Sequence, residues 1–139
     1  MTAQRAQMPE ISTLLPVRAE APAMARRFLS EFIAEALPSE MRENAELLTS
    51  EVVTNSVRHA GQWADDGIGV ELALSDDHLR VSVTDDGPGF EPVLDAPARE
   101  RDMGGFGLAL VDRISDRWGV IRNRQNVVWF ELDRRTTNR

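Results

Sequence analysis

Residues 68–85 contain two runs in which apolar and polar side chains alternate, and this pattern restricts the fold more than any other feature. The apolar positions are Ile68, Val70, Leu72 and Leu74 in the first run and Leu79, Val81 and Val83 in the second. Alternation with a period of two is typical of strands with one buried face. Asp76 and Asp77 between the runs predict a turn, so the two strands form a hairpin. A hairpin with one apolar face needs a second layer to cover it.

Helical periodicity predicts that this second layer consists of helices. Residues 21–37 carry apolar side chains at helical spacing, Pro22 suits the first turn, and Pro38 ends the helix. Ser39 can cap a second helix that runs to about residue 60, and residues 106–118 predict a third. That third helix is expected to bury Leu108, Val111, Ile114 and Trp118.

The remaining segments predict strands at 11–17, 119–123 and 126–132. The expected order is strand, helix, helix, two strands, loop, helix, two strands. The fold class predicted is α+β: a two-layer sandwich with a mixed, mostly antiparallel sheet covered by helices on one face.

The length of 139 residues suits one domain. We expect a flexible N-terminus at 1–10, the domain at 11–133 and a polar tail at 134–139. No apolar run approaches the roughly 20 residues that span a bilayer, and the N-terminus lacks the apolar segment of a signal peptide. The simplest expectation is a cytoplasmic protein that does not bind membranes.

Charge and missing residue types exclude several kinds of site. The net charge of −7 argues against direct nucleic-acid binding. All 16 basic residues are arginine, so a P-loop lysine and Schiff-base chemistry are excluded. Cysteine is absent and His59 and His78 are the only histidines, which argues against a zinc site.

Strand parity distinguishes two adjacent aspartates in the stretch VTDDGPGF. The period of two places Asp85 on the buried face with Val83, whereas Asp86 points towards water. Taken alone, the stretch also fits an ordinary hairpin turn, because Asp-Gly and Pro-Gly pairs favour turns. A buried carboxylate is costly unless a donor meets it, and Gly87 and Gly89 would let a flat ligand approach the backbone.

Two further motifs carry polar groups to positions where a ligand could bind. Asn55 lies on the stripe of the second helix that also contains Leu48, Val52 and His59, and Glu51 lies one turn before Asn55. The alternative is a solvated glutamate and an asparagine that hydrogen-bonds within its own helix. The glycine-rich stretch at 104–107 opens a helix, which favours an anion site but also fits an ordinary loop.

Together, these motifs resemble those of the GHKL (Bergerat-fold) ATPase superfamily. SEVVTNSVRHA is similar to the N box, DDGPGF to the first glycine box and GGFGLALV to the second, over about residues 11–133. The opening LLPVRAEAPAMARRFL and the closing DRWGV and VVWFEL are similar to bacterial anti-sigma-factor serine/threonine kinases. Histidine kinases carry an asparagine where this chain has Glu51, which disfavours that subgroup.

The resemblance implies that the chain binds ATP and Mg²⁺. Asn55 would hold the Mg²⁺, Glu51 would be the general base, and Asp85 would accept from the adenine amine. The other implied nucleotide contacts are Arg58, Gly87, Gly89, Gly104, Gly105, Phe106, Gly107 and Leu108. His59 is expected to be a packed residue, and Arg99 and Arg101 could reach the γ-phosphate or remain solvated.

The implied function is an anti-sigma factor with serine/threonine protein kinase activity. It would sequester a sigma factor and phosphorylate an anti-sigma-factor antagonist; a homodimer is left open. The alternative is a non-catalytic Bergerat-fold module that sequesters a partner. Relatives often carry a Gly-Lys-Thr-like turn before the last strand, where this chain has RQNVVWFEL, with Val127 in the neighbourhood of the threonine. This departure predicts weaker adenine binding.

Overall fold

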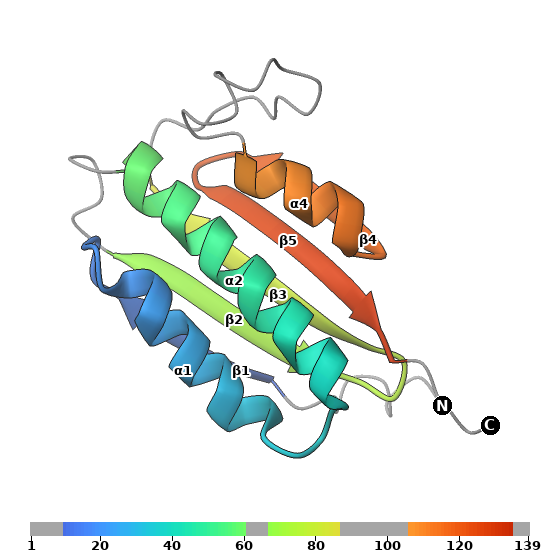
Figure 1. The fold of residues 1–139 in the computed structure, drawn as a ribbon. Coiled ribbons are helices and arrows are strands. Elements are labelled where there is room, and N and C mark those ends of the chain that lie inside the picture. The colour runs from blue at the N-terminus through green and yellow to red at the C-terminus, as the bar shows by residue number, and fades with distance from the viewer. Residues whose placement is uncertain (1–9, 61–66, 87–105, 135–139) are drawn as a thin grey trace.

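The computed structural model describes residues 10–60, 67–86 and 106–134. Within these ranges it contains five strands and three helices in the expected order (Figure 1). They are β1 (Glu10–Leu15), α1 (Ala21–Ile33), α2 (Ser39–Ala60), β2 (Ile68–Leu74), β3 (His78–Asp85), α4 (Phe106–Ile114), β4 (Arg117–Arg122) and β5 (Asn126–Asp133).

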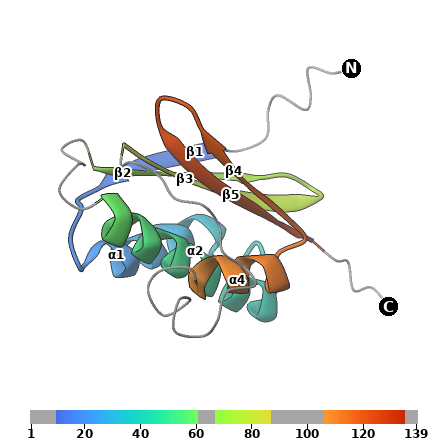
Figure 2. The same ribbon diagram turned by 90° about the horizontal axis from the view of Figure 1, so that it is seen from above.

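The strands form one sheet in the order β1-β2-β3-β5-β4, and each described pair of neighbours is antiparallel. Figure 2 shows all three helices on the same face of the sheet. The predicted two-layer α+β sandwich is therefore confirmed. The parallel pairing that a mixed sheet requires does not occur among these strands.

The core lies between the helices and the covered face of the sheet. The alternation predicted for β3 is present, because Leu79, Val81 and Val83 are buried. Phe130 on the neighbouring strand β5 is the largest fully buried side chain among the described residues. Leu48 on α2 is fully buried as well, so the predicted apolar stripe of this helix faces the sheet.

Two helices end earlier than the apolar spacing predicts. Helix α1 ends at Ile33, because Ala34 has a positive φ of 24°; its N–H still completes the last helical hydrogen bond, to the carbonyl of Ser30. Helix α4 ends at Ile114, and Trp118 belongs to β4 rather than to the helix. The backbone N–H of Asp116 donates to the carbonyl of Glu131, which draws the chain into the sheet before another helical turn can form.

None of the helices in the described part of the chain is long and apolar enough to cross a membrane.

Candidate functional site

Asp85 ends the buried row of β3, as strand parity predicts. Its side chain is 6% exposed and continues the apolar positions of Val81 and Val83. Asp86 is half-buried and accepts a solvent-exposed hydrogen bond of 2.9 Å from Nε2 of Gln125. This bond joins the end of β3 to the turn before β5.

Asn126 provides the donor that meets the buried carboxylate. It lies opposite Asp85 in the β3–β5 register, is 8% exposed, and donates from Nδ2 to Oδ1 of Asp85 at 3.2 Å. Val127 pairs with Thr84 and points to the opposite face of the sheet from Asp85. Counting back in steps of two from the buried Val128 would have placed Asn126 on the core face.

Helix α2 carries the other predicted polar residues. Asn55 is 5% exposed, and its Nδ2 has no hydrogen-bond partner among the described residues. The alternative in which this amide hydrogen-bonds within its helix therefore does not hold for Nδ2. Glu51, one turn earlier, is half-buried, Arg58 is exposed, and His59 is half-buried.

The elements that carry these residues meet at one end of the molecule. Helix α2 packs on β3 and α4, and Figure 1 shows the end of α2, the end of β3 and the beginning of α4 at the same edge. Leu108 lies in the first turn of α4 with its side chain fully buried in the core, so its implied contact would come from the backbone. Phe106 and Gly107 begin this helix. The other predicted glycines (Gly87, Gly89, Gly104 and Gly105) and the arginines Arg99 and Arg101 lie outside the described residues.

The described side chains fit a nucleotide with its metal ion. A carboxylate has about four acceptor positions, so Asp85 can serve Asn126 and an exocyclic amine together. The unpartnered amide of Asn55 can turn its oxygen to a hard cation and its Nδ2 to a phosphate oxygen. No group of three or more acidic, histidine or cysteine side chains suited to a metal occurs among the described residues. A cation held by Asn55 would therefore take further ligands from phosphate oxygens and water.

The chain is similar to known proteins over most of its length. The histidine kinase-like ATPase domain family matches residues 15–132. The serine-protein kinase RsbW of Listeria monocytogenes is 32% identical over 123 residues, covering 77% of this chain and 76% of that protein. An uncharacterized protein of Streptomyces coelicolor is 39% identical over 71 residues, covering 51% of this chain and 67% of that protein.

Solved structures show the same fold. The RsbU and RsbW domains of a Mycobacterium tuberculosis protein match with a TM-score of 0.69 and 23% identity; the match covers 92% of this chain and 33% of that chain. A chain in the crystal structure of the SiaB–SiaC complex from Pseudomonas aeruginosa matches with a TM-score of 0.67 and 13% identity; the match covers 94% of this chain and 93% of that chain. The matched family model spans most of the sequence and includes the α2 and β3 motifs. The chain therefore belongs to the histidine kinase-like ATPase domain family of the GHKL superfamily.

Proposed function

We propose that the protein is an ATP-dependent serine/threonine protein kinase and anti-sigma factor. It would sequester a sigma factor and phosphorylate a serine of an anti-sigma-factor antagonist. The observation that carries the proposal is that the buried Asp85 ends β3, while the helix that packs on β3, α2, carries the buried Asn55 and, one turn earlier, Glu51. The 32% identity to serine-protein kinases named RsbW supports the reaction type.

Each side chain has a distinct role in this proposal. Asp85 accepts a hydrogen bond from the amine of adenine, and Asn126 holds the Asp85 carboxylate in place. Asn55 holds the Mg²⁺, which neutralises charge on the transferred phosphoryl group. Glu51 accepts the proton of the attacking serine hydroxyl. Glu51 lies one helical turn from Asn55, so α2 fixes the base relative to the metal ligand.

A kinase assay with a matched control tests the role of Glu51. The purified chain is incubated with Mg-ATP and the cognate antagonist, and phosphoserine is measured by mass spectrometry. Loss of a general base is expected to lower the phosphorylation rate roughly 10²- to 10⁴-fold in Glu51→Gln. Glu43→Gln, an exposed acid on the same helix, should match wild type.

The outcome also separates the two candidate functions. Phosphoserine that is insensitive to Glu51→Gln would overturn the assigned base. Tight antagonist or sigma-factor binding without any phosphoserine from the wild type would instead support a non-catalytic module that sequesters its partner.

A further inference from the structure

A groove of about 310 Å³ lies where the beginning of α2, the end of α4 and the end of β5 meet. Figure 1 shows these ends together, at the opposite end of the sheet from the end of α2. The register gives the same result, because Asp133 of β5 pairs with His78 at the beginning of β3, whereas Asp85 ends that strand. At about 3.3 Å per residue, the His78 end of β3 is about 23 Å from Asp85. The groove is therefore separate from the candidate nucleotide site.

The floor of this groove is apolar. Met41 of α2 and Ile114, the last residue of α4, line it together with Leu132 of β5. Leu132 is buried, whereas Met41 and Ile114 are half-buried and keep apolar surface in contact with water. A partner that covers this surface removes apolar area from water, which favours binding of an apolar side chain here.

The rim of the groove carries acidic side chains. Glu40, Asp116 and Asp133 line it, and neither arginine nor histidine is among the described residues that do so. Glu40 and Asp116 are exposed. Asp116 is held in place on both sides, because its N–H donates to the carbonyl of Glu131 and its Oδ2 accepts from the N–H of Asp133 at 2.7 Å. The rim therefore presents a carboxylate in a fixed position above the apolar floor.

The charge of the rim is neutralised only in part within the described molecule. Arg117 forms an ion pair with Asp133. Glu40 has no ion-pair partner among the described residues. Arg113, in the last turn of α4, is exposed but does not line the groove. A cation from outside can therefore approach Glu40 and gain a charge pair that the single chain lacks.

The size and charge of the groove indicate the class of ligand. Its carboxylates repel phosphate groups, so nucleic acids and anionic membrane surfaces are disfavoured. Pockets for small molecules measure about 300–1,000 Å³ and enclose most of the ligand. This groove is at the lower limit of that range and its rim is exposed, so it fits one or two side chains of a protein rather than a whole small molecule.

We propose that this groove, which we call the acidic groove, binds a segment of a partner protein that carries an apolar side chain next to a basic one. The apolar side chain lies on Met41 and Ile114, and an arginine or lysine beside it pairs with Glu40 and Asp116. The proposal goes beyond the proposed kinase function, because the acidic groove is a second surface that requires neither nucleotide nor phosphoryl transfer. A short segment buries little area, so a second contact by the same partner would strengthen its binding.

Methyl NMR with two defined peptides tests the acidic groove. The full chain with labelled methyl groups is titrated with acetyl-Arg-Leu-Leu-Arg-amide, whose arginines flank the leucines so that either direction of binding brings one to the rim. The methyl signals of Met41 and Ile114 should shift and reach saturation. Met24 on α1 is the internal control, because it is 37% exposed and distant in sequence, and its signal should not shift. Acetyl-Glu-Leu-Leu-Glu-amide should shift none of the three.

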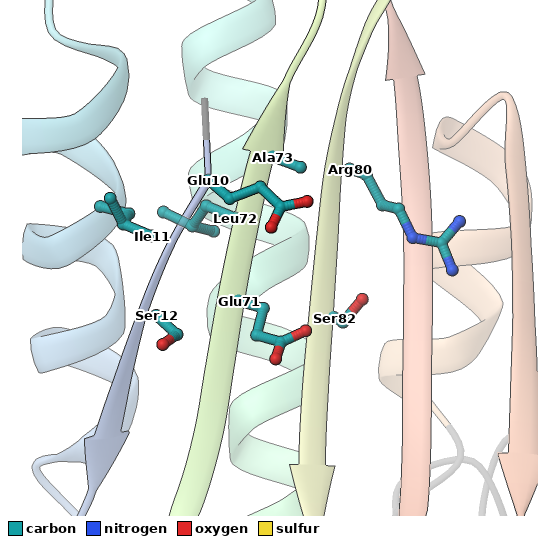
Figure 3. A pocket seen from close by; sticks show the side chains of 8 residues that line it. All are labelled: Glu10, Ile11, Ser12, Glu71, Leu72, Ala73, Arg80 and Ser82. Carbon is teal, nitrogen blue, oxygen red and sulfur yellow. The ribbon is translucent and has the colours of Figure 1, made fainter. Parts of the chain in front are cut away.

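Reversal of one rim charge gives the quantitative test. Glu40→Lys replaces an attraction by a repulsion and should raise the dissociation constant of the basic peptide roughly three- to tenfold. Glu71→Lys is the matched control, because Glu71 is an exposed glutamate beside a different hollow, on the other face of the sheet (Figure 3). It changes the net charge by the same amount and should bind the peptide as the wild type does. An unchanged Met24 signal shows that each variant is folded.

Three results would overturn the proposal. They are the absence of a saturable shift at Met41 and Ile114, equal shifts with the acidic peptide, and a Glu40→Lys variant that binds the basic peptide as tightly as Glu71→Lys does. The titrations contain no ATP, Mg²⁺ or antagonist. Failure of the acidic groove is therefore distinguishable from failure of the proposed kinase function.

Discussion

At the scale of single residues, the candidate site depends on a carboxylate that the sheet holds in an apolar row. Burial of Asp85 is unfavourable without a donor, and the amide of Asn126 supplies one at 3.2 Å. Gln125, in the turn before β5, donates to Asp86, so two consecutive aspartates each accept from one of two consecutive amides. Both hydrogen bonds join the end of β3 to the beginning of β5.

Replacing Asp85 by asparagine should remove most of the ATP affinity. The change keeps the volume but replaces one carboxylate acceptor by an amide donor, which would face the amine of adenine. Loss of a charge-assisted hydrogen bond is expected to raise the dissociation constant for Mg-ATP roughly 10- to 100-fold, measured by calorimetry. Asp86→Asn is the matched control and should change the constant less than about threefold. Equal effects of the two changes would contradict the assignment of Asp85.

The sequence predicts Asp85 but not its partner, and the reason is physical. Strand parity is a local property, so the face of Asp85 follows from Val81 and Val83 alone. The partner depends on the register between β3 and β5, which are 41 residues apart at this pair. The comparison of motifs points to Val127, whereas the register places the preceding residue, Asn126, opposite Asp85.

At the scale of elements, the beginning of β2 depends on Gly67, whose importance does not follow from the alternation of apolar and polar residues. Gly67 has a φ of 90°, and a Cβ there would lie 2.7 Å from the carbonyl oxygen of Leu15. Because that atom belongs to the backbone of β1, neither strand can move aside without losing pairing.

Alanine at Gly67 should therefore destabilise the fold. We expect Gly67→Ala to lower the free energy of unfolding by about 2 kcal/mol, measured by urea denaturation at low protein concentration. Gly69→Ala, two residues further on and within β2, is the control, because its Cβ would meet no atom closer than 3.8 Å. It should change the free energy by less than about 1 kcal/mol. A tolerated Gly67→Ala would show that β1 and β2 can separate at this end.

Glu131 links β3, β5 and β4 by accepting from Arg80 at 2.9 Å and from Arg117 at 2.6 Å. Burial acts to raise its pKa, but the hydrogen bonds from Arg117 and Arg80 outweigh it, so the pKa lies below the ordinary value of 4.5. A carboxyl group with a lowered folded pKa stabilises the fold above its unfolded pKa. That stabilisation is lost as the pH falls through the lower folded pKa.

Replacing Glu131 by glutamine should therefore give a pH-dependent loss of stability. The difference in unfolding free energy between wild type and Glu131→Gln is expected to be about 1 kcal/mol at neutral pH. It should stay constant down to about pH 5 and shrink as the pH falls further below the ordinary value of 4.5. Chemical denaturation between pH 3 and 7 measures it (roughly the range over which a carboxyl group titrates). A difference that grows with acidity would contradict the assigned sign.

Sequence periodicity misjudges two helix ends, and the backbone ends each helix for a different reason. Apolar spacing continues past Ile33 and Ile114, but Ala34 leaves the helical conformation with a positive φ, and the N–H of Asp116 donates to the carbonyl of Glu131 in the sheet. Periodicity reports which side chains can be buried together and not where the chain must turn. Strand and helix identities were therefore predictable, whereas their last turns were not.

At the scale of the whole molecule, the sheet separates two surfaces that can act independently. The helices lie on one face of the sheet with the buried residues of the candidate site, and the opposite face carries the ion pairs of Glu131 with Arg80 and Arg117. A change on one face should therefore leave the other intact.

Thermal unfolding can test this independence. Mg-ATP at about one hundred times its dissociation constant should stabilise the wild type by about 2.7 kcal/mol, which corresponds to a midpoint increase of roughly 10 °C. Leu14→Glu changes an exposed residue on the face opposite the helices and should show the same increase. Asp85→Asn should show almost none. A Leu14→Glu variant that has lost the increase would show that the faces are coupled.

Strand β3 presents alternate residues to opposite faces of the sheet, so a shift of the chain by one residue changes which side chains face the helices. Its odd positions from Leu79 to Asp85 face the helices, and its even positions from Arg80 to Thr84 face outward. A substitution in this strand changes a side chain on only one of the two faces. A single-residue insertion or deletion exchanges the two sets beyond the point of change and carries Asp85 to the wrong side. Such a change is therefore expected to disturb both faces of the sheet at once.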